Sequence, residues 1–574
     1  MKIRGTELFV KALKEEGVDI IFGYPGGYVI DIFDELYEEK DIEVILPRHE
    51  QGLIHAADGY ARSTGKVGVC LVTSGPGATN LVTGIATANY DSVPLVCFTG
   101  QVSVDLIGND AFQEIDIVGI TRNICKYAVT VRDRKDLGRI IKEAFYIAKS
   151  GKPGPVVIDL PKDVMLELGD DDYPSEVNIR GYKPNTEVHI GQLKRAFDVL
   201  LKAKKPLFLI GGGVNIAGAN KQFEELVQIT KIPVITTIMG KGAISTANPY
   251  YIGNVGMHGS YSANKAISEC DVLFSIGTRF NDRITGKISE FAKKAKIIHV
   301  DIDSASISRN IKVDIPIVSD AKKFIEVMTR DAVEYNTREW IENIKEWDKE
   351  YPLDMKKDMG ITPEKIIKEI NNQFKESIIV TDVGQHQMWT TQYLEMNENI
   401  KLLTSGGLGT MGYGLPASLG AKLGNEEKQV ICISGDAGMQ MNIQELATAV
   451  NYELPVIICI FNNSYLGMVR QMQTLFFDKR YSSTCTRRKK SCFKKCVGPT
   501  NNCPTYSPDF VKLAESYGAK GLRVSKEEDI KEAFKEAKEN IKTPTIIEFI
   551  IDSEDLVLPM VQGGKALDNM ILDC

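Results

Sequence analysis

The sequence lacks a long apolar run, a surplus of basic residues and an N-terminal targeting segment. No apolar stretch reaches the roughly 18 residues that a membrane-spanning helix requires, so we expect no membrane span. Asp and Glu (76) outnumber Lys and Arg (69), and a net charge of −7 offers no basic surface for nucleic acid. Residues 1–7 have neither the apolar core of a signal peptide nor the Arg- and Ser-rich composition of a transit peptide. These absences predict a cytoplasmic protein that binds neither membranes nor nucleic acid.

Cysteine is sparse outside one short segment. Four of the 11 cysteines fall between residues 485 and 503, and the other seven are scattered. The scattered ones, several of them inside apolar stretches, are Cys70, Cys97, Cys125, Cys270, Cys432, Cys459 and Cys574. Isolated cysteines of this kind are typical of small buried side chains in a reducing compartment, and they do not indicate a disulfide framework.

Apolar strand-like runs alternate with helical patterns along the whole chain, whose length allows three or four domains. The alternation predicts an α/β protein with mainly parallel sheets that are flanked by helices on both faces. A polar stretch at 167–185 and a second break near Tyr351-Pro352 divide the chain into three blocks. We therefore expect domains at 1–165, 186–345 and 360–574.

Two polar side chains follow apolar strand-like runs in the last block. Asp436 comes just after 430–434, and Asn463 comes after 455–461, 27 positions further along the chain. Such an interval fits a strand, a crossover helix and a parallel strand, so that both residues would emerge at one sheet edge. A carboxylate and an amide oxygen there suit Mg2+ when phosphates supply the other ligands. The alternative is an aspartate that caps a helix and an asparagine in an ordinary turn.

Glycine-rich turns and one glutamate follow other expected strands. Glu50 lies where a strand meets an Ala-rich helix, and it either caps that helix or faces a ligand. The glycine-dense stretch 406–414 runs into a helix, where backbone amides can hold phosphate oxygens. His386, taken alone, is more typical of a hydrogen-bonded turn than of a catalyst. Further turns of this kind lie at 23–27, 73–80 and 381–386.

Taken in order, these motifs resemble the catalytic subunits of acetohydroxyacid synthases, also called acetolactate synthases, which are thiamine diphosphate enzymes. Asp436-Ala437-Gly438, followed by Asn462-Asn463, matches the diphosphate and metal motif, with Ala437 where the family usually has Gly. The resemblance covers essentially the whole chain and implies three doubly wound α/β domains, each with a mainly parallel sheet flanked by helices. The other matching segments are 24–27, 48–50, 110–114, 257–259, 279–283, 385–386 and 409–412.

The resemblance implies which residues would hold thiamine diphosphate and Mg2+. Glu50 would hydrogen-bond the pyrimidine ring and so promote loss of the thiazolium C2 proton. Met411 would support the bent form of the cofactor, and Asp436, Asn463 and the backbone of Tyr465 would ligate Mg2+. The remaining cofactor residues implied in this way are Gly27, Gln385, His386, Gly409, Asp436, Ala437 and Gly438.

The middle block in this family binds FAD as a structural group that is not turned over. The run Arg279–Arg283 separates the biosynthetic enzymes, which carry the flavin, from catabolic acetolactate synthases, which do not. Lys152 stands where many relatives have Arg, and this departure leaves the retention of FAD open. The residues that match the FAD site are Gly211, Gly212, Met257, His258, Gly259, Arg279 and Asp301.

The resemblance also implies a substrate channel. Arg283 is the expected partner for the carboxylate of the second oxo acid, because a guanidinium binds a carboxylate in a fork. Met472 replaces a family Trp that helps to select 2-oxobutyrate over pyruvate, so the flexible Met predicts weaker selectivity. Tyr28 and Asp105 also depart from the family at the channel mouth. The residues that match the channel are Phe112, Gln113, Lys126 and Arg283.

The implied reaction is that of an acetolactate synthase catalytic subunit. Pyruvate is decarboxylated, and the hydroxyethyl-thiamine diphosphate carbanion condenses with a second pyruvate to give 2-acetolactate, or with 2-oxobutyrate to give 2-aceto-2-hydroxybutyrate. This is the first common step of valine, leucine and isoleucine biosynthesis. The resemblance further implies a homodimer or tetramer with active sites between chains, and a small regulatory subunit.

Two other functions stay open from the sequence. One is that of another flavin-bearing thiamine enzyme, such as a pyruvate oxidase or an oxalyl-CoA decarboxylase, although the runs 279–283 and 110–114 argue against the oxidase. The other is that of a catalytically inactive scaffold, against which Glu50, Asp436 and Asn463 argue. Glu50 also argues against glyoxylate carboligase, which lacks this carboxylate.

Residues at about 484–505 form a Cys-rich insertion where the family has a short connection. Cys485, Cys492, Cys496 and Cys503 are spaced by 7, 4 and 7 positions, which matches no short Cys-x2-Cys zinc pattern. Seven Lys and Arg residues between 480 and 495 favour the thiolate forms. Three interpretations stay open, namely a second metal or iron–sulfur site, a redox-responsive loop, and a loop without a function of its own.

Overall fold

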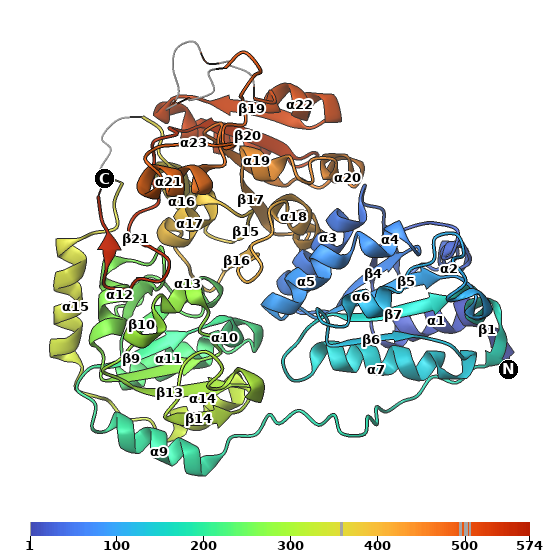
Figure 1. Cartoon of the computed structure of the whole chain (residues 1–574), viewed down its shortest axis with the longest axis horizontal. Helices are drawn as coiled ribbons and strands as arrows, with labels where there is room; N and C mark the ends of the chain where they lie inside the picture. Colours follow the sequence, from blue (N-terminus) through green and yellow to red (C-terminus); the bar gives the residue numbers. More distant parts are fainter. Residues whose placement is uncertain are drawn as a thin grey trace.

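Three six-stranded sheets, each flanked by helices, make up most of the molecule (Figure 1). The structure is a computed structural model, and it describes residues 2–355, 360–492, 496, 498, 503 and 507–573. Within the three large sheets every strand pair is parallel. The predicted α/β class, with three parallel sheets covered by helices, is therefore confirmed. Among the described residues, no helix combines the length and the apolar character needed to cross a membrane.

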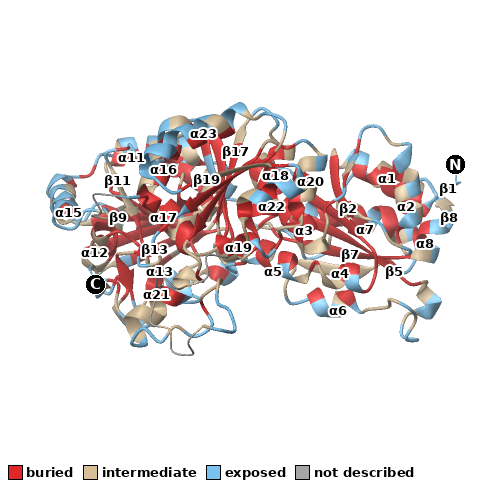
Figure 2. Ribbon diagram, turned by 90° about the horizontal axis from the view of Figure 1, so that it is seen from above, coloured by how far each residue is buried: buried red, intermediate tan, exposed pale blue. Residues whose placement is uncertain are grey.

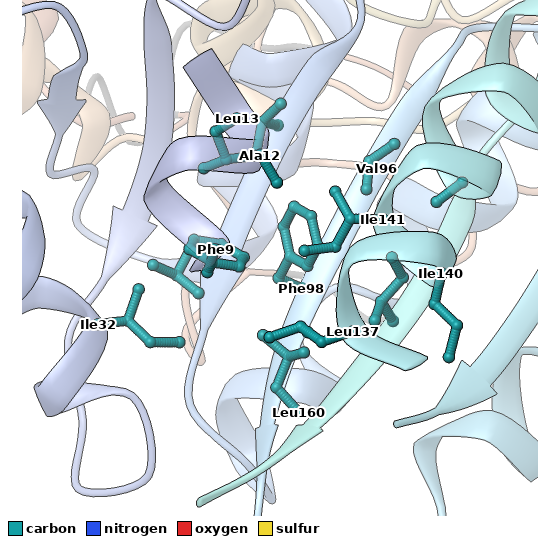
Figure 3. Packing of buried hydrophobic residues seen from close by; sticks show 14 of the residues in the cluster. Phe9, Ala12, Leu13, Ile32, Val96, Phe98, Leu137, Ile140, Ile141 and Leu160 are labelled. Atoms are coloured by element: carbon teal, nitrogen blue, oxygen red, sulfur yellow. The ribbon is translucent and has the colours of Figure 1, made fainter. Parts of the chain in front are cut away.

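The first sheet lies near the N-terminus and is covered on both faces. Its strands, in spatial order, are β3 (Glu43–Ile45), β2 (Ile20–Tyr24), β4 (Gly68–Val72), β5 (Leu95–Gln101), β7 (Val156–Pro161) and β6 (Tyr127–Thr130). Val96 and Phe98 pack with one set of helices (Figure 3), whereas Leu95 and Cys97 pack with the other. Alternate residues of a strand point to opposite faces, so both faces of this sheet bury apolar side chains.

The helices of the first domain divide accordingly. The face of Phe98 is covered by α1 (Gly5–Glu15), α2 (Ile30–Tyr37), α7 (Leu137–Lys149) and α8 (Lys162–Leu166). The opposite face is covered by α3 (Glu50–Thr64), α5 (Val82–Asp91) and α6 (Ile117–Thr121). A long irregular connection then leads to the middle domain (Figure 1), as the polar composition predicts. Its first residues differ from that expectation, because β8 (Leu168–Asp170) pairs with β1 (Lys2–Arg4).

The middle sheet repeats the arrangement. Its strands, in spatial order, are β11 (Tyr251–Asn254), β10 (Val234–Thr236), β9 (Pro206–Ile210), β12 (Val272–Ile276), β13 (Lys296–Asp301) and β14 (Ile315–Val318). One face is covered by α9 (Ile190–Leu200), α11 (Asn220–Thr230) and α14 (Ala321–Arg330). The other face is covered by α12 (Tyr261–Glu269) and α15 (Arg338–Glu350). Trp340 of α15 donates its indole N–H to the carbonyl of Pro206 at 3.1 Å, which ties this helix to the sheet.

The third sheet carries the motif of Asp436 and Asn463. Its strands, in spatial order, are β16 (Ile400–Thr404), β15 (Ser377–Thr381), β17 (Gln429–Gly435), β18 (Ile457–Asn462), β20 (Thr545–Ile550) and β19 (Lys520–Val524). One face is covered by α16 (Pro363–Gln373), α17 (Gln385–Tyr393) and α23 (Ile530–Glu539). The other is covered by α18 (Gly414–Leu423), α20 (Glu445–Asn451) and α22 (Phe510–Tyr517). The chain runs from β17 through α19 (Asp436–Met439) and α20 to β18, and this crossover makes β17 and β18 parallel neighbours.

The first and third domains share a tightly packed helix pair, α3 against α18 (Figure 2). The hydroxyl of Tyr413 donates to Asp58 at 2.7 Å, and Arg62 forms ion pairs with Asp58 and Asp91 at 2.6 and 3.0 Å. The C-terminal segment returns to the middle domain, where the Val561 amide donates to the carbonyl of Met257 at 2.8 Å. That segment contains a small antiparallel pair of β21 (Met560–Val561) with β22 (Met570–Ile571).

Candidate functional site

Asp436 and Asn463 meet at the carboxyl edge of the third sheet. The chain leaves β17 at Gly435 and enters the short helix α19 (Asp436–Met439), while β18 ends at Asn462. Gly435 is paired with Phe461 in the ladder, which brings the two strand ends level. Both side chains line one cavity of about 100 Å3. The strand, helix and parallel strand predicted from the 27-residue interval are therefore present.

The Asp436 carboxylate is buried and has one neutral side-chain donor. It is 1% exposed, and its Oδ2 accepts a hydrogen bond of 2.9 Å from the hydroxyl of Thr486. Burial raises the pKa of Asp436 to about 7, because the charged form loses its hydration. A cation beside the carboxylate would reverse that penalty. A carboxylate and an amide oxygen are ligands that Mg2+ takes, so the donor set fits this metal.

The amide of Asn463 is held in place by its neighbours. Its Nδ2 donates to Oε1 of Gln385 at 3.2 Å, and its Oδ1 accepts from the Tyr465 backbone N–H at 3.0 Å. Gln385 in turn donates to Oε1 of Gln471 at 3.0 Å and to the Asp555 carbonyl at 3.1 Å. The Gln385 side chain thus orients Asn463. Gln471 is the third member of this hydrogen-bonded network, and the sequence pattern did not reveal it.

His386 offers an unused polar atom in the same cavity. Its Nε2 is buried and has no hydrogen-bond partner among the described residues. Burial lowers the pKa of His386 to about 3, so the ring is neutral at physiological pH. A buried ring nitrogen without a partner is costly unless a ligand bonds it, and a phosphate oxygen would accept from its N–H form.

Asp382 organises the glycine-dense loop, and sequence reasoning missed it. Its carboxylate accepts backbone N–H groups from Val383, Gly412 and Gly414 at 2.8, 2.9 and 2.9 Å. A Cβ on Gly438 would lie 2.4 Å from Oδ1 of Asp382, so the turn after Asp436 needs a glycine at this position. The available signal was its place as the first polar residue after the apolar strand β15.

A larger cavity of about 720 Å3 adjoins the Asp436 cavity. Met411 lines both, so its side chain lies at their junction. Met472 and Arg283 also line the large cavity, and the Arg283 side chain is 64% exposed. The other sequence-predicted residues that line it are Met257, His258, Gly259, Arg279 and Gly409.

A third cavity, of about 270 Å3, continues into the middle domain. It shares Arg279 with the large cavity and is lined by Gly211, Gly212 and Asp301. A Cβ on Gly211 would lie 2.1 Å from the carbonyl oxygen of Gly277, so the two turns touch through their backbones. Burial raises the pKa of Asp301 to about 6. The structure thus groups all the residues predicted for FAD around two connected cavities.

Lys152 and His258 add polar side chains to the lining of the two connected cavities. Lys152 lines the cavity of Gly211, and its Nζ lies 3.5 Å from Oδ2 of Asp303. Burial lowers the pKa of His258 to about 4, and its Nδ1 has no partner among the described residues. An unbonded ring nitrogen on a cavity wall suits a polar ligand.

The residues predicted in the first domain lie elsewhere. Glu50 begins α3, and its Oε2 accepts from the amide of Asn80 at 2.9 Å. Every described residue that lines the Asp436 cavity belongs to 383–551, so Glu50 and Gly27 lie outside it. Gly27 is exposed at the end of β2, and the carboxyl ends of β2 and β3 place Gly27 and Glu50 at one sheet edge.

Phe112, Gln113 and Lys126 also lie outside the described linings of the three cavities. Phe112 is 80% exposed, and its carbonyl accepts from the hydroxyl of Tyr28 at 2.8 Å. Lys126 donates to the carbonyl of Ser150 at 2.7 Å and to the hydroxyl of Tyr182 at 3.0 Å. Burial lowers its pKa to about 8, and in this chain the ammonium ties down the end of α7.

The four insertion cysteines surround a separate small cavity, of about 30 Å3, which Tyr465 also lines. Within the described parts of the chain, no three His, Cys, Asp or Glu side chains are grouped as metal ligands. The thiols of Cys485, Cys492 and Cys496 form no disulfide.

Comparison with known proteins places the chain in a family. Models of thiamine pyrophosphate enzymes match it in order: the N-terminal TPP binding domain over residues 3–120, the central domain over 193–328 and the C-terminal TPP binding domain over 382–549. The chain is 48% identical over 591 residues to the probable acetolactate synthase large subunit of Methanococcus aeolicus, covering 99% of this chain and 95% of that protein. The chain belongs to the acetolactate synthase large-subunit family.

Other members of the acetolactate synthase large-subunit family agree over the same extent. The large subunit of Cyanidium caldarium is 45% identical, with 99% of this chain and 96% of that protein covered. The isozyme 3 large subunit of Escherichia coli is 41% identical, with coverage of 99% and 98%. The predicted family and the thiamine enzyme fold are thus confirmed, and thiamine pyrophosphate is another name for the expected thiamine diphosphate.

Proposed function

We propose that this chain catalyses the acetolactate synthase reaction with thiamine diphosphate, Mg2+ and a structural FAD. In this reaction pyruvate loses CO2, and the remaining two-carbon unit joins a second pyruvate or 2-oxobutyrate. One observation carries the proposal. Asp436, Asn463 and His386, whose Nε2 has no hydrogen-bond partner among the described residues, line one cavity, and Met411 lines both this cavity and the cavity of Arg283. The residues proposed for the metal and the diphosphate would thus lie on walls next to the guanidinium proposed for the acceptor carboxylate.

The proposed cofactor residues divide into metal ligands and cofactor contacts. Asp436, Asn463 and the Tyr465 backbone are the proposed Mg2+ ligands, and the turn Asp436–Gly438 with His386 and Gln385 would hold the diphosphate. When bound, thiamine diphosphate supplies the electron sink that lets an oxo acid lose CO2 and add to a second one. Gly409 has a φ of 72°, a backbone conformation that favours glycine, and it leaves room beside Met411.

Glu50 is proposed to come from a second chain. It would share a proton between its carboxyl oxygen and the pyrimidine of the cofactor, which requires a carboxylate close to the ring. Glu50 and Gly27 lie at a sheet edge outside the cavity of Asp436, so a second copy would bring this edge over that cavity. We therefore propose a homodimer or tetramer in which each site needs two chains. Phe112 and Gln113 would reach the substrate channel from the same partner chain, whereas the Lys126 ammonium is held by Ser150 and Tyr182 of its own chain.

FAD would occupy the cavity of about 270 Å3 and the part of the large cavity that the middle domain lines. The backbones of Gly211 and Gly212, together with Asp301, would face its nucleotide part, while Met257–Gly259 and Arg279 would face its ring. Lys152 would lie near the phosphates as a point charge, in place of a forked guanidinium. A small regulatory subunit and a cytoplasmic location complete the proposal.

The proposed substrate contacts are Arg283 and Met472. The guanidinium of Arg283 would orient the carboxylate of the acceptor oxo acid through paired N–H donors. Met472, on the wall of the same cavity, would contact the alkyl group that distinguishes 2-oxobutyrate from pyruvate. A flexible thioether at this position fits both acceptors.

The test is acetolactate formation from pyruvate with thiamine diphosphate, Mg2+ and FAD, for the wild type and Glu50→Gln. We expect product from the wild type and a loss of about 100-fold or more in the variant, the usual contribution of a positioned acid–base group. Glu43→Gln, which changes an exposed glutamate of β3, is the matched control and should keep full activity. Consumption of pyruvate without acetolactate would instead indicate a decarboxylase or an oxidase. No consumption by the wild type, even with an added small subunit, would overturn the proposal.

A further inference from the structure

Four cysteines that are spread over 19 residues of sequence face one small space. Cys485, Cys492, Cys496 and Cys503 line a single cavity of about 30 Å3. Tyr465, Tyr481, Arg487 and Arg488 line the same cavity, so the thiols have aromatic and cationic neighbours. The shared lining of so small a cavity shows that the four cysteines lie near one another in the fold, although their sequence positions span 19 residues.

These thiols differ from the other cysteines in exposure. All four are partly exposed, whereas Cys70, Cys97, Cys270, Cys432 and Cys459 are buried. Burial also raises the pKa of the Cys270 and Cys432 thiols, which disfavours their reactive thiolate forms. Cys125 is the one other described cysteine with partial exposure, and burial raises its pKa to about 11. Partial exposure beside cationic groups is typical of reactive cysteines.

The first of these cysteines lies one residue from a contact to the metal motif. Cys485 forms an isolated antiparallel bridge with Tyr465, flanked by hydrogen bonds from Leu466 N to Thr484 O at 2.8 Å and from Thr486 N to Ser464 O at 2.9 Å. The hydroxyl of Thr486 then donates to Oδ2 of Asp436 at 2.9 Å. A displacement of Cys485 therefore moves Thr486 relative to Asp436.

We propose that this cysteine cluster is a thiol–disulfide site, in which Cys485 forms a disulfide with one of Cys492, Cys496 and Cys503. The oxidant is a low-molecular-weight disulfide of the glutathione disulfide class. One protein thiolate attacks a sulfur of the small disulfide, breaks its S–S bond and releases one small thiol. A second protein thiolate attacks the mixed disulfide and releases the other small thiol. Two protein thiols lose two electrons and two protons, and the small disulfide becomes two thiols.

The consequence falls on the Mg2+ site, and this part rests on the proposed function. A disulfide requires its two Cα atoms to lie about 4.4–6.8 Å apart, so closing one onto Cys485 constrains the segment 484–486. That segment carries the Thr486 hydroxyl and forms the isolated bridge to Tyr465, whose backbone is a proposed Mg2+ ligand. Oxidation therefore lowers the affinity for Mg2+, and reduction restores it.

The first measurement maps the thiols of the full-length protein, purified without oxygen and treated with glutathione disulfide. Arg487 and Lys494 provide tryptic cleavage sites between Cys485, Cys492 and Cys496, so the mass of a crosslinked peptide separates Cys492 from the other two candidates. Cys496 and Cys503 share one tryptic peptide, and fragmentation of that peptide distinguishes them. We expect two alkylatable thiols to be lost, with Cys485 crosslinked and Cys125 still alkylated. Retention of every thiol, a persistent mixed disulfide, or stoichiometric zinc bound to the four cysteines would overturn the proposal. In Cys485→Ser the crosslink to residue 485 must disappear, whereas Cys125→Ser must keep it.

The second measurement is the Mg2+ dependence of thiamine diphosphate binding, by calorimetry, for the reduced and the oxidised protein. Loss of a hydrogen bond to a charged group corresponds to about a tenfold change in a binding constant. We therefore expect the oxidised protein and Thr486→Val to need about tenfold more Mg2+ for cofactor binding than the reduced wild type. Thr484→Val is the control, because its hydroxyl donates to Gln473 at 3.1 Å and not to Asp436. Equal Mg2+ affinity in both redox states would overturn the coupling. A failure to bind the cofactor in either state would count against the proposed function, while peptide mapping would still decide the disulfide.

Discussion

Gly420 of α18 lies against the backbone carbonyl of Ala56 in α3, so close that a Cβ on Gly420 would be 1.7 Å from the oxygen. The reverse contact is similar, because a Cβ on Gly59 would lie 2.0 Å from the carbonyl oxygen of Ala417. The two helices therefore meet backbone to backbone. This contact sets the separation of the first and third domains within one chain, and with it the position of Glu50 at the start of α3.

We expect Gly420→Ala to destabilise the protein, because neither backbone can yield without moving a whole helix. Overpacking of this kind costs about 1–3 kcal/mol or more. Gly563→Ala is the matched control, because a Cβ there meets no atom within 4 Å. Thermal unfolding of the two variants measures the effect. A melting temperature for Gly420→Ala equal to that of the control would show that the helix pair is loosely packed.

Asp382 should matter to cofactor binding, although it is not one of the proposed Mg2+ ligands. Asp382→Asn keeps the shape but turns an N–H2 group toward the amides of Gly412 or Gly414. Leaving buried donors unsatisfied costs about 1–3 kcal/mol, so we expect thiamine diphosphate to bind about tenfold more weakly. Titration of the cofactor measures this, with Asp478→Asn, an exposed aspartate, as the control. Unchanged binding would show that the glycine-dense loop does not need its anchor.

Met472 should set the acceptor preference. We expect the wild type to discriminate only weakly between 2-oxobutyrate and pyruvate, and Met472→Trp to shift the products toward 2-aceto-2-hydroxybutyrate. The indole ring of the variant narrows the cavity and contacts the extra methylene of 2-oxobutyrate. Such a contact changes the discrimination between the two acceptors by about 1–3 kcal/mol. Met472→Leu conserves volume and should leave the ratio unchanged. The assay is direct competition between the two acceptors, and a strong 2-oxobutyrate preference in the wild type would contradict this role.

Asp159 of β7 should make stability depend on pH. It is 1% exposed, and burial raises its pKa from the ordinary 3.8 to about 6. Hydrogen bonds from Thr99 and Gln101, at 2.9 and 3.1 Å, lower the pKa but do not offset the effect of burial. A raised folded-state pKa means that the folded protein binds the proton more tightly than the unfolded chain. The contribution of Asp159 to stability therefore falls as pH rises from about 4 to 6, by about 3 kcal/mol.

The variant Asp159→Asn removes this titration. The difference in melting temperature, variant minus wild type, should be more positive at pH 7.5 than at pH 4.5. Any loss from altered hydrogen bonds is the same at both values and cancels in the comparison. Asp172→Asn, at an exposed aspartate of the irregular connection, should show no such difference. A flat profile for Asp159→Asn would show that the carboxyl is not shifted.

Much of the site could be predicted from local patterns. Asp436 and Asn463 each follow a run of apolar residues, and parallel strands expose their carboxyl ends at one edge of a sheet. That rule alone brings the two residues together, because the 27-residue interval allows only one crossover. The same rule groups Gly27 with Glu50 at the edge of the first sheet.

Only the tertiary structure decided which side chains share a space. The carboxylate of Asp382 bonds the amides of Gly412 and Gly414, and Thr486 bonds Asp436 across 50 positions, as no local pattern indicates. The Lys126 side chain bonds the carbonyl of Ser150 at the end of α7, and the Gln385 side chain bonds Gln471. The physical reason is that strand ends follow from neighbouring residues, whereas contacts between distant segments depend on how helices and sheets pack. The sequence by itself therefore determined the family, the three sheets and the meeting of Asp436 with Asn463, and packing decided the anchor of the loop and the contact of the cysteine segment with Asp436.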